Sequence, residues 1–171
     1  YSASKASAEM LVRAWSKTFN LPTIIIRSSN NFGPYQNNEK FIPTIISNLI
    51  NKKKIPVYGK GKNIRNWIYV EDNVDAIFKI IKKGKIGEVY NIAGNIEISN
   101  IKLVKIIEKI LVNKFKYKFK DKYVFEFVKD RPGHDKKYSM EFNKLKSLGW
   151  HPKVKFKDGL FKTISWFLND K

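Results

Sequence analysis

A short apolar run between a helical stretch and a polar turn constrains the fold of this chain most strongly. Residues 23–26 read Thr-Ile-Ile-Ile, a β-branched run typical of a strand buried on both faces of a parallel sheet. Before it, residues 1–19 contain no helix breaker and repeat apolar side chains at about 3.6-residue spacing, and Asn20-Leu21-Pro22 ends the helix. A helix followed by a buried strand is typical of the alternating elements of an α/β fold, which we therefore predict.

The alternation of helices and strands continues along the chain. We predict further helices over residues 41–54, 72–83, 101–112, 141–148 and 158–168, and strands over residues 55–58, 64–70, 88–93 and 124–128. Asp72 is the expected N-cap of its helix. Residues 114–122 alternate Lys with aromatic residues, which predicts a half-buried extended edge. The alternative for this segment is an aromatic and basic strip for single-stranded nucleic acid.

Composition bounds the class of protein. The 171 residues are 43% hydrophobic, contain no linker or repeat, and predict one continuous globular piece. No apolar run approaches the roughly 18 residues that a membrane span needs, and the first residues read as a helix rather than a leader, so we expect a cytoplasmic protein. There are no cysteines, and His134 and His151 have no ligand spacing, so we expect no metal site.

The net charge of +19 suggests an anionic partner. Of the 34 basic residues only four are arginines, and a planar two-pronged donor cannot be replaced by lysine, so each arginine is more informative than any lysine. The four arginines are Arg13, Arg27, Arg65 and Arg131. Nucleic-acid binding stays open as an alternative, although the charges are spread along the chain and no nucleic-acid-binding motif is present.

Two polar segments contain candidate catalytic or ligand-binding residues. Tyr1 and Lys5 are four residues apart and so lie on one face of the first helix, where an ammonium beside the phenol favours a general base. The alternative is a surface pair at a helix start. The polar residues 27–34 follow the first strand, and ligands of open α/β sheets bind beyond the carboxyl ends of strands. Asn30 and Asn31 are therefore candidate ligand contacts or turn formers.

Five blocks resemble a known family. They are Y-S-A-S-K-A-S-A-E from Tyr1, S-N-N-F-G-P from Ser29, P-V-Y-G-K-G with I-R-N-W-I-Y-V-E-D over residues 56–72, Y-N-I-A-G from Tyr90, and D-R-P-G-H-D from Asp130. In this order they resemble the carboxyl-terminal half of the dTDP-glucose 4,6-dehydratases, which are extended short-chain dehydrogenases/reductases. The resemblance covers nearly the whole chain.

The resemblance implies a role for each matching residue. Tyr1 would take the proton from the sugar 4-hydroxyl, and Lys5 would hold the nicotinamide ribose beside it. Asn30 would contact the substrate and Asn31 the cofactor. The other implied substrate-binding residues are Lys40 and Phe41 near the phosphates, Pro56, Val57 and Tyr58 around the nucleobase, Arg65 and Arg131 on the diphosphate, and Asn100 and His134 beside it.

The implied reaction depends on NAD. The sugar is oxidised at carbon 4 by hydride transfer, water is eliminated across carbons 5 and 6, and the hydride returns to carbon 6, with the cofactor carrying the redox chemistry. The sequence contains no G-x-G-x-x-G or G-x-x-G-x-x-G phosphate loop, and the acids that the family uses for water loss would precede Tyr1. We therefore predict a truncated chain that is inactive alone.

The resemblance also implies the architecture and the partners. Residues 1–30 and 64–95 would be the remainder of a Rossmann-type parallel sheet, interleaved with a small sugar-nucleotide-binding domain over residues 31–63 and 96–171. The partners would be a dTDP-sugar and, through the first helix, a second copy in a homodimer, with no specific nucleic acid and no membrane. Another sugar-nucleotide epimerase or decarboxylase, and a basic nucleic-acid-binding domain, remain as alternatives.

Overall fold

The computed structural model describes residues 1–119, 125–130 and 132–169. Its helices are α1 (Ser2–Phe19), α2 (Phe41–Ile50), α3 (Val70–Lys83), α4 (Asn100–Phe115), α5 (Asn143–Ser147) and α6 (Phe156–Asn169). Its strands are β1 (Ile25–Ser28), β2 (Asn30–Phe32), β3 (Ile55–Tyr58), β4 (Ile64–Tyr69), β5 (Val89–Ile92), β6 (Ile96–Ser99), β7 (Phe125–Val128) and β8 (Lys137–Tyr138). The α/β class is confirmed.

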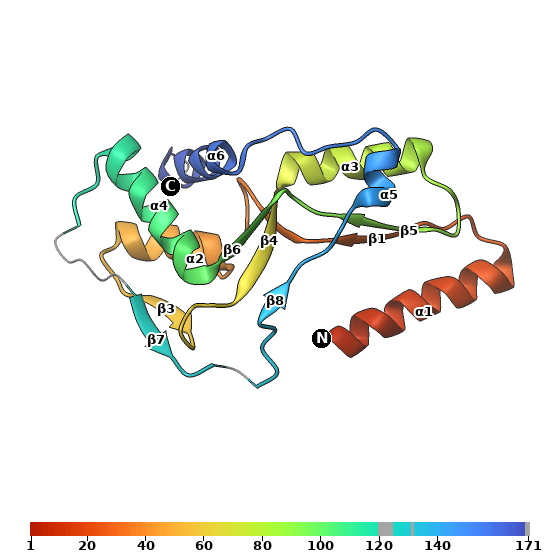
Figure 1. The fold of residues 1–171 in the computed structure, drawn as a ribbon, viewed down its shortest axis with the longest axis horizontal. Helices are drawn as coiled ribbons and strands as arrows, with labels where there is room; N and C mark the ends of the chain where they lie inside the picture. Colours follow the sequence, from red (N-terminus) through yellow and green to blue (C-terminus); the bar gives the residue numbers. More distant parts are fainter. Residues whose placement is uncertain (120–124, 131, 170–171) are drawn as a thin grey trace.

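The first predicted strand lies in a parallel pair. β1 pairs with β5 in the register Ile25 with Val89 through Ser28 with Ile92. Helices α1 and α3 lie on opposite sides of this pair (Figure 1). Parallel pairing with a helix on each side is the arrangement that a continuous β-branched run predicts.

Strand β4 joins the two halves of the molecule. It pairs in parallel with β2 and β8 and antiparallel with β6. Successive side chains of a strand point to opposite faces. Trp67 and Tyr69 accordingly lie in one hydrophobic cluster, and Ile68 between them lies in another. We call these clusters the larger core and the smaller core.

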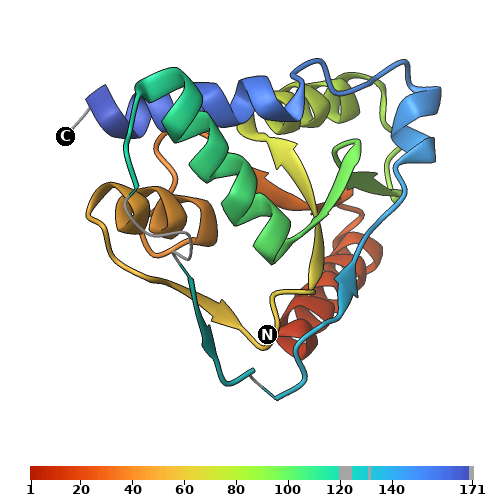
Figure 2. The same ribbon diagram turned by 60° about the vertical axis from the view of Figure 1, so that its left-hand side comes forward.

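The larger core fills the space between three helices and the strands. Helices α2, α4 and α6 gather at the end of the molecule away from α1 (Figure 2). Their buried hydrophobic side chains pack together with those of β3, β4 and β6. The smaller core lies between α3, β5 and the segment around α5, where Ile80, Ile92 and Trp150 pack. β3 pairs in parallel with β7 at the margin of the larger core.

Two local predictions were wrong. Asp72 does not cap its helix: α3 begins at Val70, and the buried Asp72 carboxylate instead accepts hydrogen bonds from the backbone N–H groups of Lys153 and Val154, each at 3.0 Å. The expected extended edge is helical at its start, since α4 continues to Phe115. Tyr117 and Phe119 stack with ring centroids 6.3 Å apart and pack against the larger core. Residues 120–124 lie outside the described residues.

A side-chain amide fixes the turn between β5 and β6. The buried Asn66 donates to the carbonyl of Gly94 at 2.8 Å and accepts from the Gly94 N–H at 3.0 Å. A Cβ on Gly94 would stand 1.9 Å from the carbonyl oxygen of Trp67, so only glycine permits this approach. The two reciprocal bonds hold β6 against β4.

We expect Asn66→Ala to lower the free energy of unfolding by about 2–3 kcal/mol, because it leaves a buried N–H and a buried C=O without partners. Urea unfolding of the chain measures this. The matched control is Asn51→Ala, which removes an exposed amide bond to the Ser47 carbonyl and should cost less than about 1 kcal/mol. Equal losses in the two variants would contradict the assigned role.

Candidate active site

The Tyr1 and Lys5 side chains lie together at the start of α1. Tyr1 is the N-cap residue and is 93% exposed, and the Lys5 ammonium lies 5.6 Å from the centroid of its ring. The Lys5 N–H donates to the Tyr1 carbonyl at 3.0 Å, and the Ser4 hydroxyl donates to the same oxygen at 2.7 Å. The predicted juxtaposition is thus present, with the phenol accessible to a ligand.

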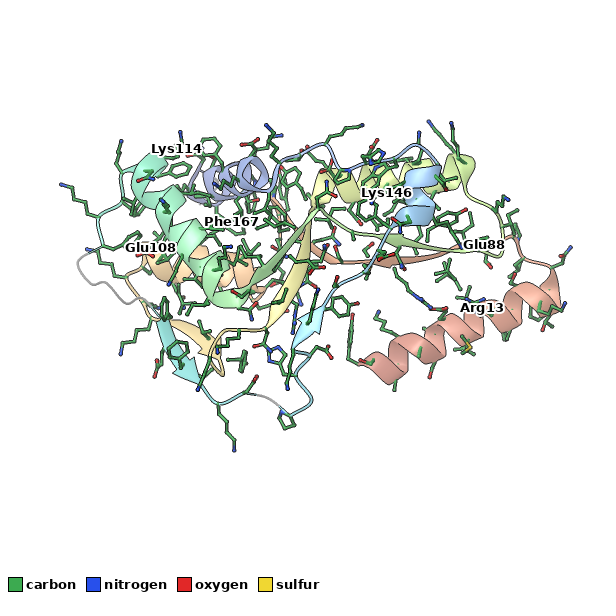
Figure 3. The ribbon with its side chains drawn as sticks, viewed as in Figure 1. Arg13, Glu88, Glu108, Lys114, Lys146 and Phe167 are labelled. Atoms are coloured by element: carbon green, nitrogen blue, oxygen red, sulfur yellow. The ribbon has the colours of Figure 1, made fainter. Side chains whose placement is uncertain are left out.

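A single carboxylate joins α1 to the sheet. Helix α1 has no buried residue, but the Glu9 side chain is only 13% exposed. Arg27 of β1 donates to it through Nε at 3.0 Å and through its terminal nitrogen at 2.7 Å, and Arg13 adds a bond of 3.0 Å. Figure 3 shows Arg13 on the side of α1 that faces β1 and β5. The two-pronged contact attaches the middle of α1 to β1.

The charges around Glu9 control its ionisation. The hydrogen bonds from Arg27, and then those from Arg13, lower the pKa of the Glu9 carboxyl below its usual 4.5. A lowered pKa in the folded state means that the ionised form stabilises the docked helix. This stabilisation is complete above the usual value and is lost as the pH falls through the lowered pKa.

The predicted asparagines follow the carboxyl end of β1 and form the first two residues of β2. Asn30 pairs with Trp67 and Asn31 with Ile68 in the β2–β4 ladder. The Asn31 amide nitrogen donates to the Ser29 carbonyl at 3.2 Å, and the Gln36 amide nitrogen donates to the Asn31 carbonyl at 2.9 Å. The Asn31 Oδ1 atom is buried and has no partner among the described residues. It is an acceptor for which the described residues supply no donor.

A second group of predicted residues gathers around Asn63. The His134 Nδ1 atom lies 2.6 Å from a carboxylate oxygen of Asp130, and its ring meets the Tyr58 ring edge to face at 5.9 Å. Asn63 Nδ2 donates to the Asp135 carbonyl at 3.1 Å and lies 3.3 Å from His134 Nδ1. The Asn63 carbonyl accepts from the Asn100 N–H at 3.1 Å. Tyr58, Asn100 and His134 are thereby held in one place.

The remaining predicted residues occupy different environments. Lys40 is exposed at the N-cap of α2, and Phe41 packs against the larger core. Val57 is buried, so its backbone rather than its side chain can face a ligand, whereas Pro56 and Tyr58 are exposed. Arg65 lies in β4 beside Tyr138 of β8 and donates to the Ile64 carbonyl at 2.8 Å. Arg131 lies outside the described residues.

The predicted residues are not part of the two cavities found in the described part of the chain. Two cavities, of about 310 and 390 Å³, adjoin Gly94 and Asn95, and none of the predicted residues lines either of them. Within the described ranges, no cluster of three or more His, Asp or Glu side chains could hold a metal ion. None of the helices in the described part of the chain is long and apolar enough to cross a membrane.

Three contributors were missed by the sequence analysis: Glu9, Gln36 and Asn63. Each acts through a partner distant in the sequence or through a main-chain carbonyl, which no local motif specifies. The expectation that each arginine is informative is met by Arg27. Its guanidinium makes a two-pronged contact with Glu9 that a lysine could not make.

Comparisons with known proteins agree with the geometry. Residues 1–163 match the model of the GDP-mannose 4,6 dehydratase family. The chain is 47% identical to the dTDP-glucose 4,6-dehydratase of Haemophilus influenzae, over 98% of this chain and 51% of that protein. It therefore spans about half the length of the curated relatives that it matches.

Solved structures share the fold. The dTDP-glucose 4,6-dehydratase of Bacillus anthracis in complex with NAD has a TM-score of 0.89 and 43% identity, over 99% of this chain and 52% of that one. The UDP-glucuronic acid 4-epimerase of Bacillus cereus, in complex with UDP-glucuronic acid and NAD, has a TM-score of 0.89 but 26% identity, over 99% and 52%. The likeness confirms the Rossmann-type fold.

We expect Glu9→Gln to loosen α1 at neutral pH, because the amide cannot keep two charged guanidinium groups in place. Hydrogen exchange over residues 2–19, corrected for its intrinsic pH dependence, should show lower protection in the variant at pH 7. The difference should shrink as the pH falls through the lowered pKa of Glu9, where the wild type also loses the charge. Glu39→Gln, an exposed carboxylate 3.8 Å from Lys40, should leave α1 unchanged. Equal protection in the wild type and Glu9→Gln at pH 7 would contradict the proposal.

Proposed function

Because the chain belongs to the GDP-mannose 4,6-dehydratase family, we propose that the protein containing it converts dTDP-glucose to dTDP-4-keto-6-deoxyglucose with NAD as cofactor. The observation that carries this proposal is the 47% identity to a dTDP-glucose 4,6-dehydratase over nearly the whole chain. The epimerase of the same fold reaches only 26% over the same span, which favours the dehydratase over an epimerase.

The residues present fit NAD and a sugar nucleotide. Lys5 offers an exposed ammonium next to Tyr1, and Asn31 offers an acceptor without a partner in the described chain. Bound NAD supplies the hydride acceptor for oxidation at carbon 4 and the hydride donor for the later reduction. We assign Tyr1 and Lys5 as catalytic and cofactor-binding residues, and Asn31 as a cofactor contact.

Tyr1 acts as the general base in this proposal. Its phenol oxygen takes the proton of the sugar 4-hydroxyl as the hydride leaves carbon 4, and the Lys5 ammonium stabilises the phenolate. The 5.6 Å between the Lys5 nitrogen and the Tyr1 ring centre supports this role, because the two side chains share one helix face and move together. The carboxylate contact of Glu9 with Arg27 would aim this pair at the ends of β1 and β2.

The sugar nucleotide would lie between α1 and the group around Asn63. Arg65 and Arg131 would pair with the diphosphate, since guanidinium groups bind phosphate oxygens in two-pronged fashion. Lys40 and Phe41 would lie near the phosphates, Asn30 near the sugar, and Asn100 and His134 beside the diphosphate. The nucleobase would lie against Pro56, Val57 and Tyr58, where the exposed Tyr58 ring supports stacking.

The proposal includes the architecture and the setting of the enzyme. The smaller core would belong to the Rossmann-type domain and the larger core to the substrate-binding domain. The exposed Met10, Leu11 and Trp15 of α1 support burial against a second copy in a homodimer. Because the reaction consumes an activated nucleotide sugar with NAD, we place it in the cytoplasm.

The primary test uses a form of the protein that includes the amino-terminal half found in the relatives. With NAD, it should turn over dTDP-glucose and form the 4-keto-6-deoxy product, whereas UDP-glucose and UDP-glucuronate should react at least about tenfold more slowly, the factor that a difference of about 1.4 kcal/mol in transition-state binding gives. Preference for a UDP-sugar would favour the epimerase or decarboxylase. The alternative of a basic nucleic-acid-binding domain predicts that oligonucleotide binding depends steeply on salt and that no sugar nucleotide is turned over.

In the same form of the protein, Tyr1→Phe should lower the rate of sugar oxidation by roughly two to four orders of magnitude, because the general base is removed. Tyr117→Phe removes a phenol oxygen from a half-buried ring that packs against the larger core and should leave the rate unchanged. The transient absorbance of reduced NAD measures the step. Undiminished oxidation by Tyr1→Phe would exclude Tyr1 as the base.

A further inference from the structure

The turn that follows β2 is held in a costly backbone conformation. Tyr35 has a φ of +61°, in the left-handed region that residues other than glycine rarely adopt. Its exposed ring packs against Trp166 of α6 at a centroid distance of 4.7 Å. Just before it, a Cβ on Gly33 would stand 2.4 Å from a methyl carbon of Val70, so the turn lies directly on α3. Contacts from two other elements therefore fix its path.

Gln36 closes this turn back onto β2. Its Nε2 atom donates to the Asn31 carbonyl at 2.9 Å, across five residues. The Asn31 side chain repeats the pattern by donating to the Ser29 carbonyl at 3.2 Å. The two amide groups therefore form a relay of side-chain donors to main-chain carbonyls, which runs from Gln36 through Asn31 to Ser29.

The relay leaves its oxygen atoms as buried acceptors. Asn31 Oδ1, Gln36 Oε1 and Ser29 Oγ are all covered from solvent, and none has a hydrogen-bond partner within the described chain. Ser29 as a whole is 4% exposed. Buried polar atoms without partners are rare in folded proteins, so these three acceptors within eight residues require donors from outside the described chain, such as a ligand or bound water.

We infer that Gln36 is a positioning residue for Asn31. By bonding the Asn31 carbonyl it fixes the backbone from which the Asn31 side chain projects, and it keeps that side chain's oxygen turned toward an N–H or O–H donor of the cofactor. This inference rests on the proposed function, in which Asn31 contacts NAD. A purely structural role for Gln36 would affect stability without changing cofactor affinity.

The test compares two variants in the form of the protein that includes the amino-terminal half. Gln36→Met keeps the side-chain length but removes the donor, and it should raise the dissociation constant for NAD about tenfold, with kcat reduced and KM for dTDP-glucose changed less than about twofold. The matched control is Asn48→Leu, which removes an amide-to-carbonyl bond of the same length, 2.9 Å to Lys54, and involves none of the residues assigned to NAD. It should leave NAD affinity unchanged.

A second variant separates the hydrogen bond from packing. In Gln36→Glu a carboxylate faces the Asn31 carbonyl at neutral pH and cannot donate, so NAD binding should weaken as in Gln36→Met. As the pH falls and the carboxyl becomes protonated, its O–H can donate the same bond, and the affinity should recover toward that of the wild type. A structural role alone predicts no such recovery.

The outcomes separate the two proposals. A wild type that converts dTDP-glucose, with NAD affinity unaltered by Gln36→Met or equally weakened by Asn48→Leu, overturns the role of Gln36 and leaves the proposed function standing. A wild type that binds NAD but does not convert dTDP-glucose overturns the proposed function. The role of Gln36 is then still tested by comparing the NAD dissociation constants of the wild type and Gln36→Met. A wild type that binds no NAD overturns both.

Discussion

The alternation of side chains along β4 is the constraint on which the rest of the structure depends. Trp67 and Tyr69 enter the larger core and Ile68 enters the smaller one, so one six-residue strand belongs to both. The same strand aligns β2, which carries Asn30 and Asn31, and itself carries Arg65. A one-residue shift of β4 would exchange the two faces and would misplace Arg65 relative to Asn30 and Asn31.

The candidate site combines two groups that are positioned by different means. Tyr1 and Lys5 lie on a helix without buried residues, which the ion pairs of Glu9 attach to β1. The group around Asn63 is instead held by the hydrogen bonds of Asn63, by the contact between His134 and the Asp130 carboxylate, and by an aromatic contact. The first arrangement depends on one cluster of ion pairs, whereas the second distributes its contacts over several segments.

Local patterns predicted the helices and five of the strands, but not the short strands β2, β6 and β8, which depend on their pairing with β4. The run Thr23–Ile26 predicted a parallel strand buried on both faces. β1 is parallel, but it is shifted by two residues to Ile25–Ser28 and none of its residues is buried. The spacing of Tyr1 and Lys5 predicted their proximity, since helix geometry alone determines it. Asp72 was misjudged because its carboxylate binds backbone groups more than 80 residues away, at Lys153 and Val154. Gln36 and Asn63 escaped notice because carbonyl partners leave no trace in residue identity.

The pairing of β3 with β7 has a consequence for the order of events in folding. It joins residue 55 to residue 125 in parallel register at the margin of the larger core, so a long loop must close before its first hydrogen bond forms. Folding is slow where such distant segments must meet, because the entropy of loop closure is lost before the contacts are gained. A nucleotide resting on Pro56 and Tyr58 would add contacts to β3 and would thereby stabilise a pairing that no local interaction maintains.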